Sequence, residues 1–141
     1  MKYRIILLSF LVCIGGIFYF SWLPDPTLET ETYLPLWLRN WSNCYFNLRT
    51  AIPFLVLGFL LEARGSNTNR SLRINSDFTF RIINSAVAIV VVCVAEGGQF
   101  FILNRHPDFM DVVFGILGSL SGNLLYYLTN IFLQLFSTKD A

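Results

Sequence analysis

Charged residues are scarce in this chain of 141 residues: Lys, Arg, Asp and Glu together make up 13% of it. Soluble domains carry about 25% charged residues, so a chain with 55% hydrophobic and so few charged residues cannot cover its surface for water. Lipid can solvate this apolar excess, and the composition therefore indicates a membrane protein. The formal net charge is only +1, which argues against a nucleic-acid partner attracted by bulk charge.

Cysteine and histidine are also rare, with 3 and 1 copies. Cys13 and Cys93 lie in apolar runs and Cys44 lies in a polar connection, and no two of them have the C-x-x-C spacing of a zinc site or redox pair. The single histidine, His106, stands beside carboxylates but in no recognised metal-ligand spacing, and a solvent-facing turn histidine is the commoner interpretation. We therefore expect no metal site and no cofactor.

Four apolar runs approach the length needed to cross a bilayer, which is about 20 residues of helix. They lie at residues 5–23, 45–62, 82–103 and 109–136. The second is the weakest, because it contains Pro53 and reaches spanning length only if Arg49 is included. The first begins like a signal peptide, but no small-x-small cleavage site follows it, and we interpret it as a retained anchor. The runs predict an all-α membrane protein, a compact bundle of about four transmembrane helices in one domain (1–141).

The connections between these runs differ in charge. The segment 62–81 contains four arginines, and with four spans it lies on the same side of the membrane as both basic ends of the chain. Basic residues concentrate in cytoplasmic segments, so we predict cytoplasmic N- and C-termini. The apolar and aromatic residues of segment 23–47 predict either a short amphipathic segment on the outer membrane surface or a loop folded over the helix ends. Residues 65–71 are rich in Gly, Ser and Asn, which predicts a flexible loop.

Polar residues gather around the connection between the third and fourth runs. Glu96 and Gln99 are three positions apart, on one face of the third helix. A carboxylate that faces lipid costs about 2.5–3.5 kcal/mol at the membrane centre, so Glu96 should face the bundle interior, pair or be protonated. Arg105 follows in the connection, and the fourth run then carries a stripe at alternating spacings of three and four, made of Asp108, Asp111, Gly115, Gly118 and Gly122.

The glycines of this stripe permit the close approach of another helix. Because the connection after the third run contains a tight turn, the third and fourth helices should be antiparallel neighbours, with the stripe facing Glu96 and Gln99. We therefore predict a polar cluster at the outer membrane level, with helix packing at Gly115, Gly118 and Gly122. The members of the cluster are Glu96, Gln99, Arg105, Asp108 and Asp111.

Members of this cluster also have simpler interpretations. Asp108 follows Pro107 and can be the N-cap of the fourth helix, with Asp111 favoured by the helix dipole. Arg105 can extend its charge to the membrane surface, although we prefer a pairing with the carboxylates. Three acids around one arginine leave an excess of negative charge, so that one acid should be protonated or a cation bound.

The same residues carry a family resemblance. The intervals between Glu96, Gln99, Arg105, Asp108, Asp111, Gly118 and Gly122 resemble the signature of the VanZ-like family of bacterial membrane proteins, named after a member associated with teicoplanin resistance. Two positions depart from that pattern: Gly115 stands where the family usually has Asn, and Arg49-Thr50 occupy a region where it often has His or Asn. A role that the family gives to these positions is therefore either missing in this chain or, in the second region, taken over by Arg49 and Thr50. The resemblance implies a bacterial inner-membrane protein of about four spans, and it implies no settled biochemical activity.

Three functions are compatible with these observations. The first is an accessory protein whose polar cluster binds an envelope lipid, a lipid-linked cell-wall or polysaccharide precursor or a glycopeptide antibiotic, with Arg105 contacting phosphate. The second is a membrane enzyme that uses the paired acids on such a lipid, but Ser119, Ser121 and Cys93 lack an activating base in the sequence, which makes an enzyme the weaker hypothesis. The third is a structural role, in which the glycine stripe docks a larger membrane partner.

The charge distribution generates a prediction about topology. Reporter fusions after Lys139 and within residues 30–32 should report opposite compartments, the first of them cytoplasmic, because basic segments are retained inside. The measurement is the activity ratio of two compartment-specific reporters. Matching signals from the two fusions would contradict the four-span arrangement.

Overall fold

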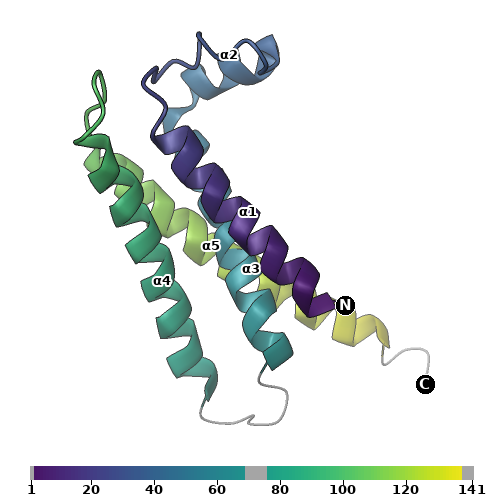
Figure 1. Cartoon of the computed structure of the whole chain (residues 1–141). Helices are drawn as coiled ribbons and strands as arrows, with labels where there is room; N and C mark the ends of the chain where they lie inside the picture. The colour runs from purple at the N-terminus through teal and green to yellow at the C-terminus, as the bar shows by residue number, and fades with distance from the viewer. Residues whose placement is uncertain (1, 69–75, 138–141) are drawn as a thin grey trace.

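The computed structural model describes residues 2–68 and 76–137, and within these residues the chain forms helices and no strands (Figure 1). The elements are α1 (Lys2–Ser21), α2 (Leu36–Cys44), α3 (Phe46–Thr68), α4 (Ser76–Gln99) and α5 (Phe109–Ser137). All except α2 are long and apolar enough to cross a membrane, by length and composition. The prediction of an all-α membrane protein with four spans is confirmed.

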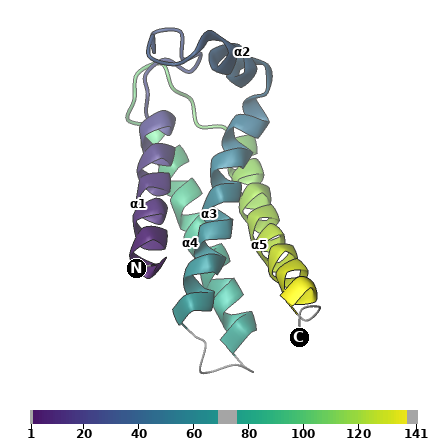
Figure 2. The ribbon, with the colours of Figure 1, turned by 90° about the vertical axis from the view of Figure 1, so that its right-hand side faces the viewer.

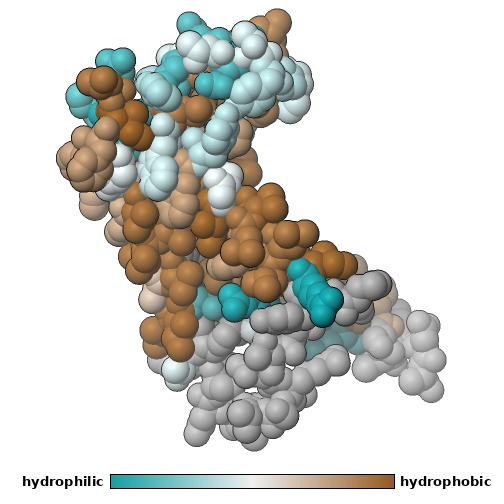
Figure 3. Space-filling model, viewed as in Figure 1, coloured by the Kyte–Doolittle hydropathy of each residue, from teal (hydrophilic) through white to brown (hydrophobic). Residues whose placement is uncertain are grey.

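The four long helices alternate in direction, so that the described chain begins and ends on the same side of the bundle (Figures 1 and 2). The opposite side carries α2 and is called the α2 end below. A hydrophobic band crosses the middle of the molecule, and more polar residues lie over the α2 end (Figure 3). This distribution suits a bundle whose middle faces lipid and whose α2 end lies at or beyond the membrane surface.

The core enclosed by protein is small. Leu57 of α3 and Val92 of α4 are fully buried, and α1 adds Phe10 and Ile17 to the same cluster. Large apolar side chains also point away from the bundle, as does Val12, which is 67% exposed. A helix that is apolar on all sides is typical of a membrane span, because lipid solvates the faces that protein leaves open.

Helices α3 and α5 approach each other closely at glycines. A Cβ atom added to Gly118 would collide with the backbone carbonyl of Ala51, and one added to Gly122 would collide with that of Leu55. Glycine has no side chain to keep the two backbones apart, which is how small residues bring membrane helices together. The predicted packing role of these two glycines thus has a definite partner, α3.

That partner differs from the predicted one, because the glycine stripe faces α3 along most of its length and not α4. Only near Gly115 does the stripe also meet α4, where an added Cβ would lie 2.8 Å from Val92 and 3.3 Å from Phe54 of α3. The reason is that α3 supplies a matching small residue: a Cβ on Gly58 would collide with the backbone of Ser119. A stripe of small residues shows which face packs closely but not which helix packs on it.

Two helix ends also differ from the predicted bounds. Helix α4 ends at Gln99, before the predicted end at residue 103, and the chain then turns through residues 100–108, with Asn104 at a φ of 66°. The two glycines before Gln99 favour this end because glycine is a poor helix former. Helix α3 continues to Thr68, so residues 65–68 are helical where a flexible loop was predicted, and the rest of that loop lies outside the described residues.

The chain between α1 and α3 folds over the α2 end of the spans, which was one of its two predicted arrangements. Leu28 is buried there, and Leu34 and Leu38 are half-buried. Leu36 and Trp37 instead point outward, with 68% and 70% of their surface exposed. Apolar side chains at this position can enter the membrane surface, as in the other predicted arrangement.

The α3–α5 contact generates a prediction about stability. Gly118→Ala should destabilise the protein by about 1–3 kcal/mol, the usual cost of overpacking, because its Cβ would collide with the Ala51 carbonyl. Gly97→Ala is the matched control, since nothing lies within 4 Å of the Cβ position there. Thermal unfolding in a mild detergent measures both effects, and equal unfolding temperatures for the two variants would contradict the close contact.

Candidate ligand-binding site

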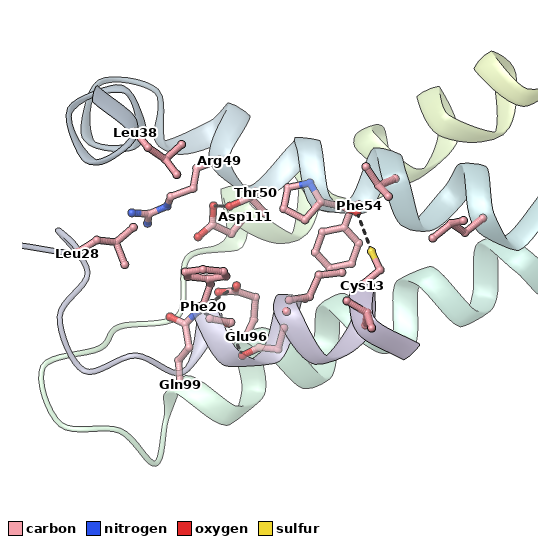
Figure 4. A pocket seen from close by; sticks show the side chains of 18 of the residues that line it. Cys13, Phe20, Leu28, Leu38, Arg49, Thr50, Phe54, Glu96, Gln99 and Asp111 are labelled. Atoms are coloured by element: carbon pink, nitrogen blue, oxygen red, sulfur yellow. Dashed lines mark hydrogen bonds between the residues drawn. The ribbon is translucent and has the colours of Figure 1, made fainter. Parts of the chain in front are cut away.

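A cavity of about 710 Å³ lies between α1 and α3 and extends to the α2 end of α4 and α5 (Figure 4). Its volume is within the range of about 300–1,000 Å³ that small-ligand sites usually have. The lining changes along its length: apolar side chains line the part toward the middle of the bundle, called the groove, and charged and polar side chains line the other part, called the polar end. The polar end contains Ser21, Arg49, Thr50, Glu96, Gln99, Arg105 and Asp111.

The groove follows one face of α1 and is open to the lipid-facing surface. Leu8 and Val12 of α1 line it, opposite Phe54 and Val56 of α3. Val12 and Val56 are also 67% and 43% exposed, so the groove reaches the surface between the two helices. From Leu8 to the end of α1 the helix rises about 20 Å. The groove can therefore accommodate an extended alkyl chain that enters sideways from the bilayer.

Glu96 is buried at the polar end, with 7% of its surface exposed. Its Oε1 accepts a hydrogen bond from Gln99 Nε2 at 3.0 Å, and its Oε2 accepts one from the backbone N–H of Asp108 at 3.3 Å. The Gln99 amide also donates to Ser21 Oγ at 3.0 Å. As the spacing predicted, the polar face of α4 points into the bundle, where Glu96 and Gln99 find hydrogen-bond partners.

Asp111 lies in the first turn of α5 and faces α3 across the polar end. Its Oδ1 accepts a hydrogen bond from Thr50 Oγ1 at 2.6 Å. Thr50 was not predicted as a site residue, and the sequence singled it out only as a departure from the family pattern. Asp111 and the glycines Gly118 and Gly122 share one face of α5, so the close α3–α5 contact also brings these two side chains together.

Arg105 has partners other than the predicted carboxylates. Its Nε donates to the carbonyl oxygen of Leu23 at 2.6 Å, and its Nη2 donates to that of Phe20 at 3.1 Å. It forms no ion pair with a carboxylate of the described residues. The physical reason is that the last carbonyl groups of a helix have no partner within it, and a guanidinium at the end of α1 can satisfy them and interact favourably with the helix dipole.

Arg49 brings a second guanidinium to the polar end and was not predicted as a member of the cluster. Its side chain extends from the first turn of α3 (Figure 4), and its Nη1 donates to the carbonyl oxygen of Pro26 at 2.7 Å. Burial, followed by the charge of Arg49, lowers the pKa of Arg105 below its ordinary value. Both guanidiniums line the same cavity. A charged residue at the start of an apolar run was the signal that could have identified Arg49.

Asp108 caps α5 and does not line the cavity. Its Oδ1 accepts a hydrogen bond from the backbone N–H of Met110 at 2.8 Å, one residue after α5 begins at Phe109. The N-cap interpretation is confirmed, and Asp108 contributes to the site through the N–H that it donates to Glu96. His106 is exposed in the connection before it. The structure thus brings four of the five predicted cluster residues to the cavity, namely Glu96, Gln99, Arg105 and Asp111.

Comparison with known proteins finds no match for this chain among family models, curated proteins or solved structures. The cavity itself has two chemically distinct parts. Its polar end offers guanidinium donors, carboxylate acceptors and neutral amide and hydroxyl groups, next to a groove that is apolar and open to lipid.

The hydrogen bond between Thr50 and Asp111 generates a prediction about stability. Thr50→Val keeps the shape of the side chain but leaves Asp111 without its donor, which should cost about 1–3 kcal/mol because a partly buried carboxylate loses a partner. Thr50→Ser keeps the hydroxyl and should recover most of this loss. Thermal unfolding in detergent compares the variants. If the valine and serine variants unfold together with the unchanged protein, the hydrogen bond contributes nothing to stability.

Proposed function

We propose that this protein is a bacterial inner-membrane protein that binds an envelope lipid or a lipid-linked cell-wall or polysaccharide precursor in the cavity. The observation that carries the proposal is the division of the cavity into an apolar groove and a polar end. An amphiphilic ligand has the same division. Its alkyl chain would lie in the groove, and its headgroup would lie among the charged side chains of the polar end.

The orientation of the molecule supports an envelope ligand. Basic residues favour the terminal side of the bundle as the cytoplasmic one. The polar end of the cavity is on the other side, because most of its lining residues belong to the start of α3, the end of α4 and the start of α5. The headgroup would then lie at the outer face of the membrane. Resemblance to VanZ-like proteins at residues 96–122 supports the same placement, since the family name refers to resistance to teicoplanin, an amphiphilic lipoglycopeptide that acts outside the membrane.

Catalysis has narrower support, from a single pair of residues. The Thr50 hydroxyl donates to the Asp111 carboxylate at the polar end, and a hydroxyl beside a carboxylate base is one arrangement used in nucleophilic catalysis. However, the described residues that line the cavity include no histidine or lysine that could act as a general base beside the hydroxyl. We therefore favour binding. Turnover of a lipid phosphate by the purified protein, lost in Asp111→Ala, would favour the enzyme instead.

Filling the groove tests the proposed function. Gly16 lines the cavity and its neighbour Gly15 does not, and nothing lies within 4 Å of the Cβ position at either residue. Gly16→Trp should therefore occupy the space of the alkyl chain, whereas Gly15→Trp should add an exposed ring of the same size. Lipid that co-purifies with the protein, counted by native mass spectrometry, should be lost in the first variant and retained in the second.

Two outcomes of this comparison would contradict the proposal. One is the same amount of bound lipid in both tryptophan variants and the unchanged protein. The other is the absence of any stoichiometric lipid on the unchanged protein, provided that thermal unfolding shows all three proteins to be folded.

A further inference from the structure

The polar end holds two positive and two negative groups that come from different elements. Arg49 belongs to α3, Arg105 to the connection after α4, Glu96 to α4 and Asp111 to α5, and all four line the cavity. Yet, among the described residues, neither guanidinium forms an ion pair with Glu96 or Asp111. The four charges therefore surround the cavity and do not neutralise one another by direct contact.

The guanidiniums are held by backbone carbonyl groups at the end of α1 and in the chain that follows it. Arg105 donates to the carbonyl oxygens of Phe20 and Leu23, and Arg49 donates to that of Pro26. A guanidinium has five N–H groups, so these bonds orient both groups and leave further N–H groups for a ligand. Two like charges held near each other favour an anion between them, and arginine matches the geometry of phosphate oxygens.

The carboxylates occupy the other helices, and both can act as acceptors. Asp111 Oδ1 accepts the Thr50 hydroxyl, and its second oxygen accepts no hydrogen bond from the described residues. Glu96 accepts hydrogen bonds from the Gln99 side chain and the Asp108 backbone N–H, and a carboxylate has about four lone-pair sites, so it can accept more. Acceptors of this kind suit an ammonium group, which has only donors.

We propose that the headgroup bound at the polar end is a zwitterion with a phosphodiester and a primary ammonium, as in the phosphoethanolamine headgroup of a phospholipid. This inference rests on the proposed function, that of binding an amphiphile in the cavity. The phosphate lies between Arg49 and Arg105, and the ammonium donates to Asp111 and Glu96. A purely anionic headgroup would satisfy the guanidiniums but would also face two carboxylates, which disfavours it by like-charge repulsion.

The lining also distinguishes a primary from a quaternary ammonium. Quaternary ammonium groups are recognised by cages of aromatic side chains. Of the described residues that line the cavity, only Phe20 and Phe54 are aromatic, and Phe54 belongs to the groove. The polar end supplies hydrogen-bond acceptors and no aromatic cage. A choline headgroup has no N–H group that could donate to these acceptors.

A lipid panel tests the inference on the purified full-length protein in detergent. Phosphatidylethanolamine, phosphatidylglycerol and phosphatidylcholine with identical acyl chains are added in equal amounts, and native mass spectrometry counts the lipid bound. We expect phosphatidylethanolamine to be retained about tenfold more than either of the others, as charge-assisted hydrogen bonds to an added group would give. Soluble glycerophosphoethanolamine in excess, which keeps the phosphodiester and the primary ammonium but has no acyl chain, is a further arm. Displacement of the bound lipid would support recognition of this headgroup by the polar end, and stronger displacement by glycerophosphocholine would count against it.

Two isosteric variants test whether the preference for phosphatidylethanolamine depends on the carboxylates. Asp111→Asn keeps an oxygen that can accept the Thr50 hydroxyl but removes the negative charge, and Glu96→Gln does the same for the second carboxylate. Each should lower the preference for phosphatidylethanolamine over phosphatidylglycerol to about equality, because like-charge repulsion of the anionic headgroup is lost together with the ammonium partner. Glu29→Gln is the control, since Glu29 is exposed and does not line the cavity.

The outcomes separate this inference from the proposed function. Equal retention of the three lipids by the unchanged protein, or a preference for phosphatidylglycerol or phosphatidylcholine, would overturn the proposed headgroup with a phosphodiester and a primary ammonium. If the lipids retained in that case are lost in Gly16→Trp, the proposed function of binding an amphiphile stands, but the proposed headgroup does not. Retention of no lipid at all would overturn both. The panel on the unchanged protein decides the matter even if the carboxylate variants fail to fold.

Discussion

The close approach of α3 and α5 is the contact on which the candidate site depends. Gly118 and Gly122 let the two backbones meet at Ala51 and Leu55, and this fixes the relative height of the helices. Thr50 is one residue before Ala51, and Asp111 is about two turns before Gly118 on the same face of α5. Their hydrogen bond is therefore a consequence of backbone packing. A side chain at either glycine would separate the helices and the two polar groups together.

The second constraint is the shortage of water around buried polar groups in a bilayer. A carboxylate or guanidinium in such a place needs partners from the protein. Glu96 takes its partners from Gln99 and a backbone N–H, and Arg105 takes its partners from carbonyl groups at the end of α1. Each charge is thus hydrogen-bonded without being neutralised by its neighbour. This explains how the polar end can be stable and still hold unpaired charges that face a cavity.

Sequence reasoning identified what depends on composition and local spacing. The length of the apolar runs predicted the four spans, and the three-residue spacing of Glu96 and Gln99 predicted an inward face of α4. The contacts that it missed depend on packing and hydrogen-bond partners that the sequence pattern does not indicate. The glycine stripe could not indicate α3, and the partners of Arg105 are backbone carbonyls, which every residue has. Thr50 enters the site only because α3 is placed beside α5.

Helix α1 has a different relation to the bundle from that of α3 and α5. It forms one wall of the groove, and several of its side chains, such as Val12, remain largely exposed to lipid. Its side-chain hydrogen bonds to the other helices are few among the described residues. Cys13 Sγ donates to the carbonyl of Pro53 at 3.6 Å, and Ser21 Oγ donates to that of Ala95 at 3.1 Å and accepts from Gln99 Nε2 at 3.0 Å. Just beyond the helix, Trp22 Nε1 also donates to the carbonyl of Ala95 at 3.1 Å. All of these bonds except that of Cys13 lie near the α2 end of α1.

This arrangement separates two requirements of a lipid-binding cavity. The charged groups must be positioned accurately, since hydrogen bonds to a headgroup depend on distance and angle. The apolar wall needs less accuracy, since burial of an alkyl chain is non-directional and depends mainly on area. In this protein the charged groups of the polar end are positioned by the α3–α5 contact and by the hydrogen-bonded end of α1. The groove lies along the remainder of α1, which has fewer hydrogen bonds to the other helices. In the proposed binding mode, an alkyl chain that entered from the bilayer would therefore pack along α1 without disturbing the backbone contacts that position Thr50 and Asp111.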